Sequence, residues 1–261
     1  MEIPIHHIDA FVTSGVFTGN PAAVCPLREW LPDRVMQSIA TENNLSETAF
    51  FVGGNGVYEI RWMTPAAEID LCGHATLASA HVVFSKLEPG RTEVRFDSMS
   101  GPLPVRADGE RLVLDFPSRP AERREPRPDV AAALGRPPVE LWAARDYVAV
   151  FGSADEVRAL APDMGQLRKL DLKAVVATAP GSGDVDFVSR FFGPALGVDE
   201  DPVTGSSHCT LVPYWSRRLG KKRLHAHQVS ARGGDLVCDD LGDRVAIGGR
   251  VATYLEGVIT F

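Results

Sequence analysis

The stretch of sequence that decides the fold is Ile60-Arg61-Trp62-Met63-Thr64-Pro65, because a related stretch, Ser189-Arg190-Phe191-Phe192-Gly193-Pro194, follows half the chain length later. Each is a predicted strand with an arginine, then an aromatic residue, and a proline at its end. An acidic loop, a glycine and a helix are expected after each copy, in the same order. An offset of half the chain indicates a duplicated domain, since the repeats of solenoid proteins span only about 20–50 residues.

The two predicted helices run over residues 74–87 and 206–219. Asp70-Leu71-Cys72-Gly73-His74 leads into the first helix, which is apolar nearly all round and is therefore expected to be buried. Asp201-Pro202-Val203-Thr204-Gly205-Ser206 leads into the second helix, where Pro213 is expected to bend or interrupt the structure.

Helix N-termini present free N–H groups and a partial positive charge. If the two halves face each other, the helix starts at Gly73 and Gly205 can point into one cleft, which would suit a substrate that carries a carboxylate. The alternative reading is that Gly73 and Gly205 only permit close packing, and the repeat by itself leaves both readings open.

The pattern predicts an α+β protein with two related halves. Short alternating runs such as 59–63, 111–114 and 173–177 are expected strands, and residues 32–40 form an expected amphipathic helix. The proline-rich stretch from Pro117 to Pro128 is the best domain boundary. We therefore expect an N-terminal half over residues 1–118 and a C-terminal half over 119–261, with the option that the last strand returns to the first half.

Composition excludes several classes of protein. The chain of 261 residues has 44% hydrophobic and 23% charged residues, as expected for a soluble globular protein. Its net charge of -7 argues against nucleic-acid binding. The basic stretch 123–127 is interrupted by acids and is expected to be a solvated linker. No membrane-spanning segment or secretory signal is predicted, and four irregularly spaced cysteines are typical of reduced thiols in a cytoplasmic protein.

Two side chains are candidates for acid–base chemistry. Glu47 precedes the apolar run Ala49-Phe50-Phe51, where apolar surroundings disfavour the charged carboxylate and tune it for proton transfer, although a solvent-exposed rim carboxylate is the simpler reading. His74 follows Gly73 at the start of a helix and is either a donor to a substrate oxygen or an ordinary first-turn residue.

No metal site or coenzyme is expected. The pairs His6–His7 and His225–His227 are candidates by count, and strand alternation puts His225 and His227 on one face, but no third ligand is evident. A Gly-x-Gly-x-x-Gly nucleotide motif does not occur either.

Several motifs, in order along nearly the whole chain, resemble the PhzF (phenazine-biosynthesis) family. These are His7-Ile8-Asp9-Ala10-Phe11, Gly19-Asn20-Pro21-Ala22-Ala23-Val24, Asn44-Leu45-Ser46-Glu47-Thr48, Asp70-Leu71-Cys72-Gly73-His74-Ala75-Thr76-Leu77-Ala78, Asp201-Pro202-Val203-Thr204-Gly205-Ser206-Ser207 and Arg232-Gly233-Gly234. The resemblance implies a diaminopimelate-epimerase-like fold, in which each half wraps a curled, mostly antiparallel sheet around a central helix.

The resemblance also implies roles for individual residues. Glu47 matches the catalytic glutamate of the family, which moves a proton from one carbon to another without metal or coenzyme. The groups that hold the substrate and assist this shift are matched by His74, Asp201 and Ser206. Gly73 and Gly205 match backbone donors, and Asn20 and Cys72 are expected beside the substrate, a small carboxylate-bearing metabolite. A homodimer is also implied.

Two rival functions stay open at this stage. Related folds host racemases with two facing cysteines; Cys72 stands where the first would be, but Thr204 stands at the second position, so only a cysteine-assisted epimerase is conceivable. Cys72 is otherwise a small buried hydrophobe. The second rival is a binding protein that has lost turnover, against which the presence of all four expected catalytic groups argues. The identity of the substrate is not predicted.

Overall fold

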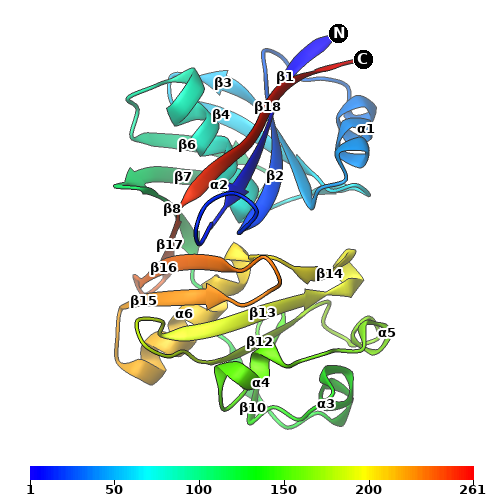
Figure 1. Cartoon of the computed structure of the whole chain (residues 1–261), viewed down its shortest axis with the longest axis vertical. Coiled ribbons are helices and arrows are strands. Elements are labelled where there is room, and N and C mark those ends of the chain that lie inside the picture. Colours follow the sequence, from blue (N-terminus) through cyan, green and yellow to red (C-terminus); the bar gives the residue numbers. More distant parts are fainter. The chain divides into compact units, whose positions relative to one another are not determined.

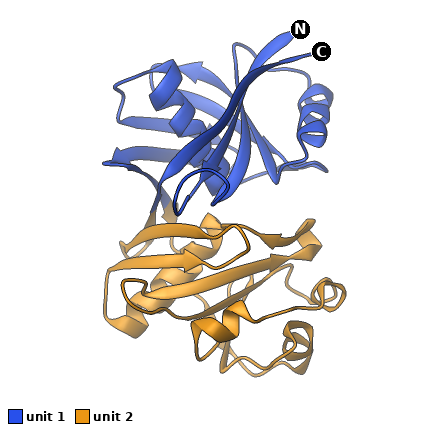
Figure 2. Cartoon of the chain, viewed as in Figure 1, with its two compact units in different colours: residues 1–115, 248–261 blue, residues 116–247 orange.

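The computed structural model describes residues 1–261 and divides into two compact units (Figure 2). Unit 1 comprises Met1–Asp115 and Gly248–Phe261, and unit 2 comprises Phe116–Ile247. The first segment of unit 1 ends at Asp115 rather than at residue 118, and the final strand belongs to unit 1, the option that the sequence analysis left open. The cause is antiparallel pairing of the last strand with the first, from Glu2 opposite Thr260 onward, which also brings the two termini side by side (Figure 1).

Unit 1 consists of a curled sheet, one outer helix and one central helix. Its strands are β1 (Glu2–Ala10), β2 (Asn20–Leu27), β3 (Glu47–Gly54), β4 (Val57–Met63), β5 (Glu68–Ile69), β6 (Glu93–Ser98), β7 (Gly101–Asp108), β8 (Arg111–Pro117, whose end opens unit 2) and β18 (Val251–Thr260). Its helices are α1 (Asp33–Asn43) and α2 (Gly73–Val82), which continues as a π-helical turn over Val83–Leu87. Most pairings are antiparallel; β2–β3 and β4–β6 are parallel.

Unit 2 repeats this plan with additional short helices. Its strands are β9 (Glu122–Arg124), β10 (Glu140–Ala143), β11 (Tyr147–Val150), β12 (Val175–Pro180), β13 (Phe187–Gly193), β14 (Val198–Asp201), β15 (Arg223–Gln228), β16 (Gly234–Asp240) and β17 (Arg244–Gly249). Its helices are α3 (Pro128–Leu134), α4 (Ala154–Arg158), α5 (Met164–Leu167), a 3₁₀ turn (Pro194–Leu196) and α6 (Gly205–Leu219). The basic stretch expected to be a solvated linker contains β9, which pairs with β10.

The pairings confirm the duplication inferred from the sequence. In unit 1, β2 and β3 are parallel, β3 is antiparallel to β4, β4 carries β5, and a helix then leads to β6 parallel to β4. In unit 2, β11 to β15 follow the same order and the same directions around α6. The predicted α+β fold, with a curled sheet around a central helix in each half, is therefore the observed architecture of each unit.

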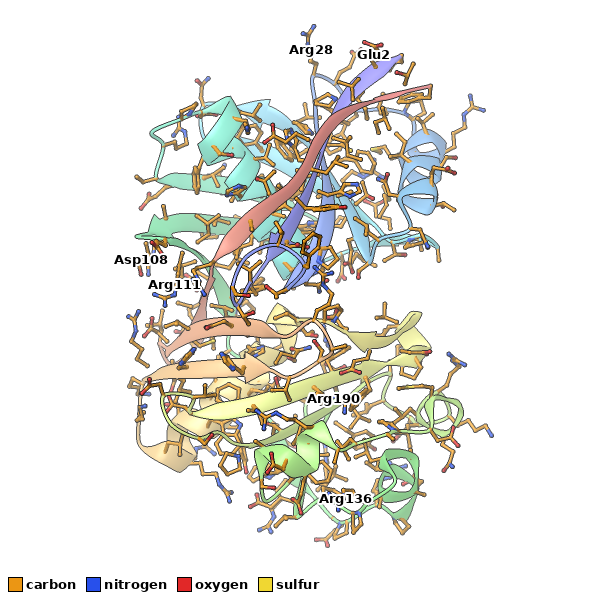
Figure 3. All side chains as sticks on the ribbon, viewed as in Figure 1. Glu2, Arg28, Asp108, Arg111, Arg136 and Arg190 are labelled. Atoms are coloured by element: carbon orange, nitrogen blue, oxygen red, sulfur yellow. The ribbon has the colours of Figure 1, made fainter.

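A charged clamp is repeated with the fold. The Arg61 side chain on β4 donates two hydrogen bonds of 2.7 Å to the carboxylate of Glu68 on β5. Arg190 on β13 (labelled in Figure 3) donates bonds of 2.7 and 2.8 Å to Glu200 on β14. The repeated acids are thus Glu68 and Glu200. Asp70 and Asp201, the acids of the two motifs that lead into the helices, are not at equivalent positions, because Asp201 directly follows Glu200 whereas Asp70 is separated from Glu68 by Ile69.

The central helices are buried as the apolar sequence predicts. In α2 every residue except His81 is buried. Pro213 does not interrupt α6, which runs continuously to Leu219. A proline removes the hydrogen bond to the carbonyl four residues before it. That carbonyl, of Cys209, accepts instead from the backbone N–H of Arg119 at 2.9 Å, so the helix passes the proline without an unpaired buried group.

Candidate active site

Glu47 and His74 meet inside unit 1. Glu47 is the first residue of β3, beside β2 with which β3 is parallel, and His74 lies in the first turn of α2. Glu47 Oε2 is 3.1 Å from His74 Nε2, and the two side chains are only 13% and 6% exposed. Neither atom has a well-aligned hydrogen bond, so the contact is a buried ion pair when His74 is protonated. The reading of Glu47 as an exposed rim carboxylate is wrong.

The local sequence explains how Glu47 reaches this position. Helix α1 ends at Asn44, which adopts a left-handed conformation with φ of 50°. Asparagine tolerates this conformation better than most residues. The Asn43 amide then donates to the Thr48 hydroxyl at 3.1 Å, which holds the turn between helix and strand and so fixes the start of β3 at Glu47.

The other imidazole nitrogen of His74 is also occupied. His74 Nδ1 lies 3.2 Å from the side-chain amide of Asn20, the first residue of β2, and 3.5 Å from the sulfur of Cys72. The contacting atom of Asn20 is its amide nitrogen, which donates to an unprotonated Nδ1, whereas the Cys72 sulfur can accept from a protonated Nδ1. Nδ1 therefore has a partner in both the neutral and the charged form of His74, and Nε2 is the nitrogen that faces Glu47.

The charges of this group are strongly coupled. Burial lowers the pKa of His74, but the adjacent Cys72 sulfur and Glu47 carboxylate outweigh burial and hold that pKa well above its ordinary value. Burial, reinforced by the Glu47 charge, raises the pKa of the Cys72 thiol. The Cys72 contribution requires an ionised thiol, so with a neutral thiol the Glu47 carboxylate is the contact that favours an imidazolium at His74.

The corresponding positions of unit 2 carry different chemistry. Thr204 precedes α6 as Cys72 precedes α2, and Gly205 and Ser206 correspond to Gly73 and His74. The Thr204 hydroxyl donates to the Asp201 carboxylate at 2.5 Å. The Ser206 hydroxyl accepts from the Arg145 guanidinium at 3.2 Å. Unit 2 thus brings Asp201, Gly205 and Ser206 together around hydroxyls and a carboxylate, with no counterpart of the Cys72 thiol.

Two residues of this second group were missed by sequence reasoning. Gln228, at the buried end of β15, accepts from the Thr204 backbone N–H at 2.9 Å and donates to the Asp201 carbonyl at 2.7 Å. Arg145 reaches Ser206 from the turn between β10 and β11. The only sequence feature that could have pointed to Gln228 is its inward position in a strand of alternating residues. Whether Gly73 and Gly205 line one cleft stays a prediction, as do the roles of all these residues.

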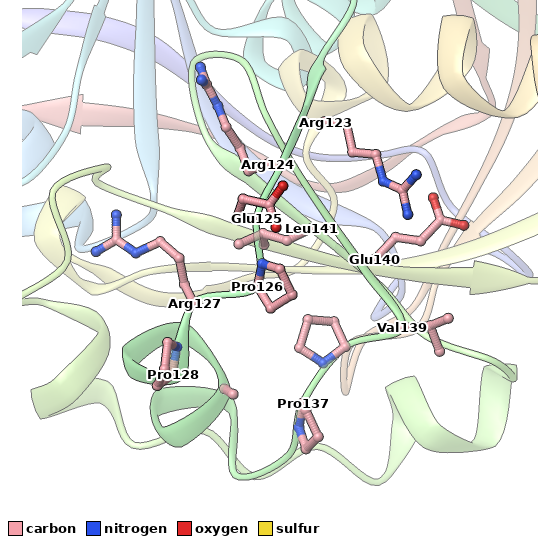
Figure 4. Close-up of a pocket in the computed structure, with 12 residues that line it drawn as sticks. Arg123, Arg124, Glu125, Pro126, Arg127, Pro128, Pro137, Val139, Glu140 and Leu141 are labelled. Carbon is pink, nitrogen blue, oxygen red and sulfur yellow. The ribbon is translucent and has the colours of Figure 1, made fainter.

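A hollow elsewhere in unit 2 contains none of the predicted site residues. Arg123, Arg124 and Arg127 line it together with several prolines and with Glu140 (Figure 4). Arg127 is already neutralised by Asp129 and Asp171, and Glu140 pairs with Arg218. These ion pairs neutralise part of the charge around the hollow.

Solved structures of other proteins share the fold. A predicted epimerase from Pseudomonas aeruginosa superposes with a TM-score of 0.74 at 19% identity, covering 99% of each chain. A PhzF family protein of Enterococcus faecalis superposes with a TM-score of 0.96 at 47% identity over 100% of both chains. The predicted diaminopimelate-epimerase-like fold is confirmed.

The family follows from the sequence relatives. Residues 8–257 match the family described as phenazine biosynthesis-like protein, PhzC-PhzF. An uncharacterized isomerase of Pseudomonas aeruginosa is 51% identical over 99% of both chains, and a phenazine biosynthesis-like domain-containing protein of Homo sapiens is 38% identical over 100% of both. The chain belongs to the phenazine biosynthesis-like (PhzF) family. Since relatives at 42–51% identity are named isomerases, the expected enzyme class, isomerase, is confirmed.

None of the helices is both long enough and apolar enough to cross a membrane.

Proposed function

We propose that the protein catalyses a cofactor-independent proton shift on a small carboxylate-bearing metabolite, with Glu47 as the group that removes and returns the proton. The observation that carries this proposal is the buried contact of 3.1 Å between Glu47 Oε2 and His74 Nε2. General acid–base catalysis requires a positioned group that can accept and donate a proton. Glu47 is such a group: its carboxylate is held in one place, is largely shielded from water and lies beside a titratable partner.

The partner makes Glu47 effective in both directions. The carboxylate of Glu47 can accept a proton from a carbon acid, and the adjacent His74 ring can stabilise the charges that change in this step. Because Asn20 and Cys72 hold the far side of the His74 ring, the ring cannot turn away from Glu47 without losing both contacts. Glu47 can then return the same proton to a second carbon, so the step balances without an oxidant, a reductant or a coenzyme.

Substrate recognition is proposed to rest on helix starts. The first turn of α2, beginning at Gly73, offers backbone N–H groups and the positive end of the helix dipole for a carboxylate or a developing oxyanion. In unit 2 we propose Gly205 as a second backbone donor, and Asp201 and Ser206 as side chains that hydrogen-bond the substrate. Gln228 would act through Asp201 and Thr204 as a positioning residue.

A cysteine-assisted epimerase is the second candidate, favoured by one observation: Cys72 Sγ lies 3.5 Å from His74 Nδ1. Two others oppose it. Burial raises the pKa of the Cys72 thiol, and a thiol is a weaker base than a thiolate. The equivalent position in unit 2 is Thr204, whose hydroxyl is engaged by Asp201.

Solvent-deuterium exchange separates these functions. The wild-type protein is incubated in D₂O with a panel of small carboxylic acids, and mass spectrometry records which of them gain deuterium. For each responsive compound, Glu47→Gln should lower the exchange rate by at least about 10²-fold, whereas Cys72→Ala should keep most of it. Glu42→Gln, on the exposed end of α1, is the matched control and should exchange like wild type.

The opposite result would refute the assignment. A Glu47→Gln protein with wild-type exchange beside an inactive Cys72→Ala protein would identify the thiol as the base. Compounds that bind the wild-type protein without any exchange would instead support a binding protein. We also propose that the enzyme is a cytoplasmic homodimer, as the family resemblance implies.

A further inference from the structure

A second group of metal-ligating side chains lies on the sheet of unit 2 and includes none of the proposed catalytic residues. His225 and His227 alternate with the buried Leu224, Ala226 and Gln228 along β15, so both imidazoles are on the same, partly exposed face. Asp235 is on the adjacent strand β16, directly opposite His227 in the antiparallel register. Strand pairing thus supplies the third candidate ligand that the sequence alone did not reveal.

The ligand atoms converge as they would around one ion. Asp235 Oδ1 is 2.9 Å from His225 Nε2, and Asp235 Oδ2 is 3.4 Å from His227 Nε2. All three side chains offer ligand atoms within 4.8 Å of one another. Two ligands of a tetrahedral zinc ion, each about 2.0–2.1 Å from the metal, lie about 3.3 Å apart. Small side-chain adjustments would therefore let all three side chains reach a common ion.

The hydrogen bonds of His225 also favour a metal site. Its Nδ1 lies 3.0 Å from the backbone carbonyl of Asp184, and a carbonyl only accepts, so Nδ1 carries a proton. Nε2 is therefore the nitrogen that faces the Asp235 carboxylate at 2.9 Å, and it is the position at which His225 would bind a metal ion in place of a proton. A metal-ligating histidine characteristically donates its other N–H to a carbonyl or carboxylate in this way.

The site is open to solvent on one side. The side chains of His225, His227 and Asp235 are 30%, 34% and 22% exposed, so an ion can reach them and keep water in a remaining position. The other three-residue group, Glu47, Cys72 and His74, is a poorer candidate, because a metal-bound cysteine must be ionised and burial raises the pKa of the Cys72 thiol.

We propose that His225, His227 and Asp235 form a binding site for a divalent transition-metal ion, with Zn²⁺ as the representative ligand. Two imidazoles and one carboxylate suit zinc and its neighbours, whereas magnesium and calcium prefer oxygen ligands alone. The site goes beyond the proposed isomerase activity, which uses none of these residues. Bound metal would bridge β15 and β16 and raise the thermal stability of the protein.

Metal titration of the tag-free, chelator-stripped full chain tests the proposal. Calorimetry with Zn²⁺ at pH 7.5 should show one site per chain in the wild type. His227→Gln and, independently, Asp235→Asn should weaken zinc binding by more than about 100-fold, beyond the 10–100-fold that loss of an outer partner costs. His7→Gln, which removes a half-buried histidine of β1, is the matched control and should bind like wild type. Circular dichroism confirms that each variant is folded.

Substitution with Co²⁺ identifies the ligands. Imidazole and carboxylate ligation should give visible d–d bands without the intense sulfur-to-cobalt absorption of a thiolate complex. Two outcomes would overturn the proposal: wild-type protein that binds zinc no better than folded His227→Gln or Asp235→Asn protein, or a thiolate spectrum that disappears in Cys72→Ala. The first would show that the contacts of Asp235 are simple histidine–carboxylate ion pairs.

Discussion

Replacing Glu47 by glutamine should change the protonation of His74, and this change can be measured without knowing the substrate. Glutamine keeps the size of the side chain and removes its charge. In the wild type, burial lowers the pKa of His74 while Cys72 and Glu47 raise it, with the pKa ending well above the ordinary value. In the variant the Glu47 contribution is lost while burial still lowers the pKa of His74, so this pKa should fall.

The structure sets the size of the effect. At the observed 3.1 Å separation, two unit charges interact by about 5 kcal/mol at an effective dielectric constant of 20. A shift of one pKa unit corresponds to about 1.4 kcal/mol. The pKa of His74 therefore falls by a full unit if about a quarter of this interaction energy remains after solvent and side chains have adjusted.

Nitrogen-15 NMR of the imidazole rings is the assay. The His74 signal is assigned with a His74→Gln variant and is then followed as a function of pH in the wild type and in Glu47→Gln. If His74 titrates identically in both proteins, the charge of Glu47 does not act on the ring. That result would refute the proposed acid–base pair.

The same pair has a consequence for stability, whose sign follows from the direction of the shift. Because the folded-state pKa of His74 is raised, its contribution is fully present below the unfolded value of about 6.5 and is lost as pH rises through the folded-state pKa. The difference in unfolding free energy between wild type and Glu47→Gln should therefore shrink as the pH rises from about 6.5 through the folded-state pKa of His74.

Three further predictions concern the scaffold and the assembly. Arg190→Met should lower the unfolding free energy by about 3 kcal/mol in denaturant titration, because it leaves Glu200 and several backbone carbonyls without their partner. Arg61→Met should lower the unfolding free energy less, because its ion pair is more exposed. Equal losses in the two variants would contradict this ranking. Gly234→Ala should destabilise by about 1–3 kcal/mol, since the new Cβ would lie 2.1 Å from Val203 Cγ2 just before α6; an unchanged melting temperature would refute it. Light scattering should give about twice the chain mass of 28.2 kDa for the proposed homodimer, and a monomeric mass would exclude it.

Local sequence patterns predicted the elements that carry the fold. The all-round apolar stretch after Gly73 is the buried helix α2, and the repeated arginines at Arg61 and Arg190 occupy matching strands. The acidic partners of these arginines were not predicted, because a pattern of residue types does not show which acid of a loop pairs with a strand. The pairing of β14 with β13 places Glu200 in the clamp.

Contacts between distant segments were the least predictable part of the site. Spacing alone made Glu47 an exposed carboxylate, and only the family resemblance favoured a catalytic role. Its contact with His74 depends on α2 packing beside β2 and β3, which no local pattern contains. The roles of Gln228 and Asp235 likewise depend on which strands and loops become neighbours.

The duplicated architecture explains how an asymmetric chemistry can arise from equivalent positions. Both copies keep the arginine–glutamate clamp and the glycine at the start of the central helix, because these features hold the strand, loop and helix together. The residues on either side of that glycine have diverged: Cys72 and His74 in unit 1, Thr204 and Ser206 in unit 2. The hydroxyls of Thr204 and Ser206 do not exchange protons readily near neutral pH, whereas Glu47 stands beside His74 in unit 1. A racemase with two facing thiols would need a cysteine at the position of Thr204. The divergence therefore favours one carboxylate that both removes and returns a proton.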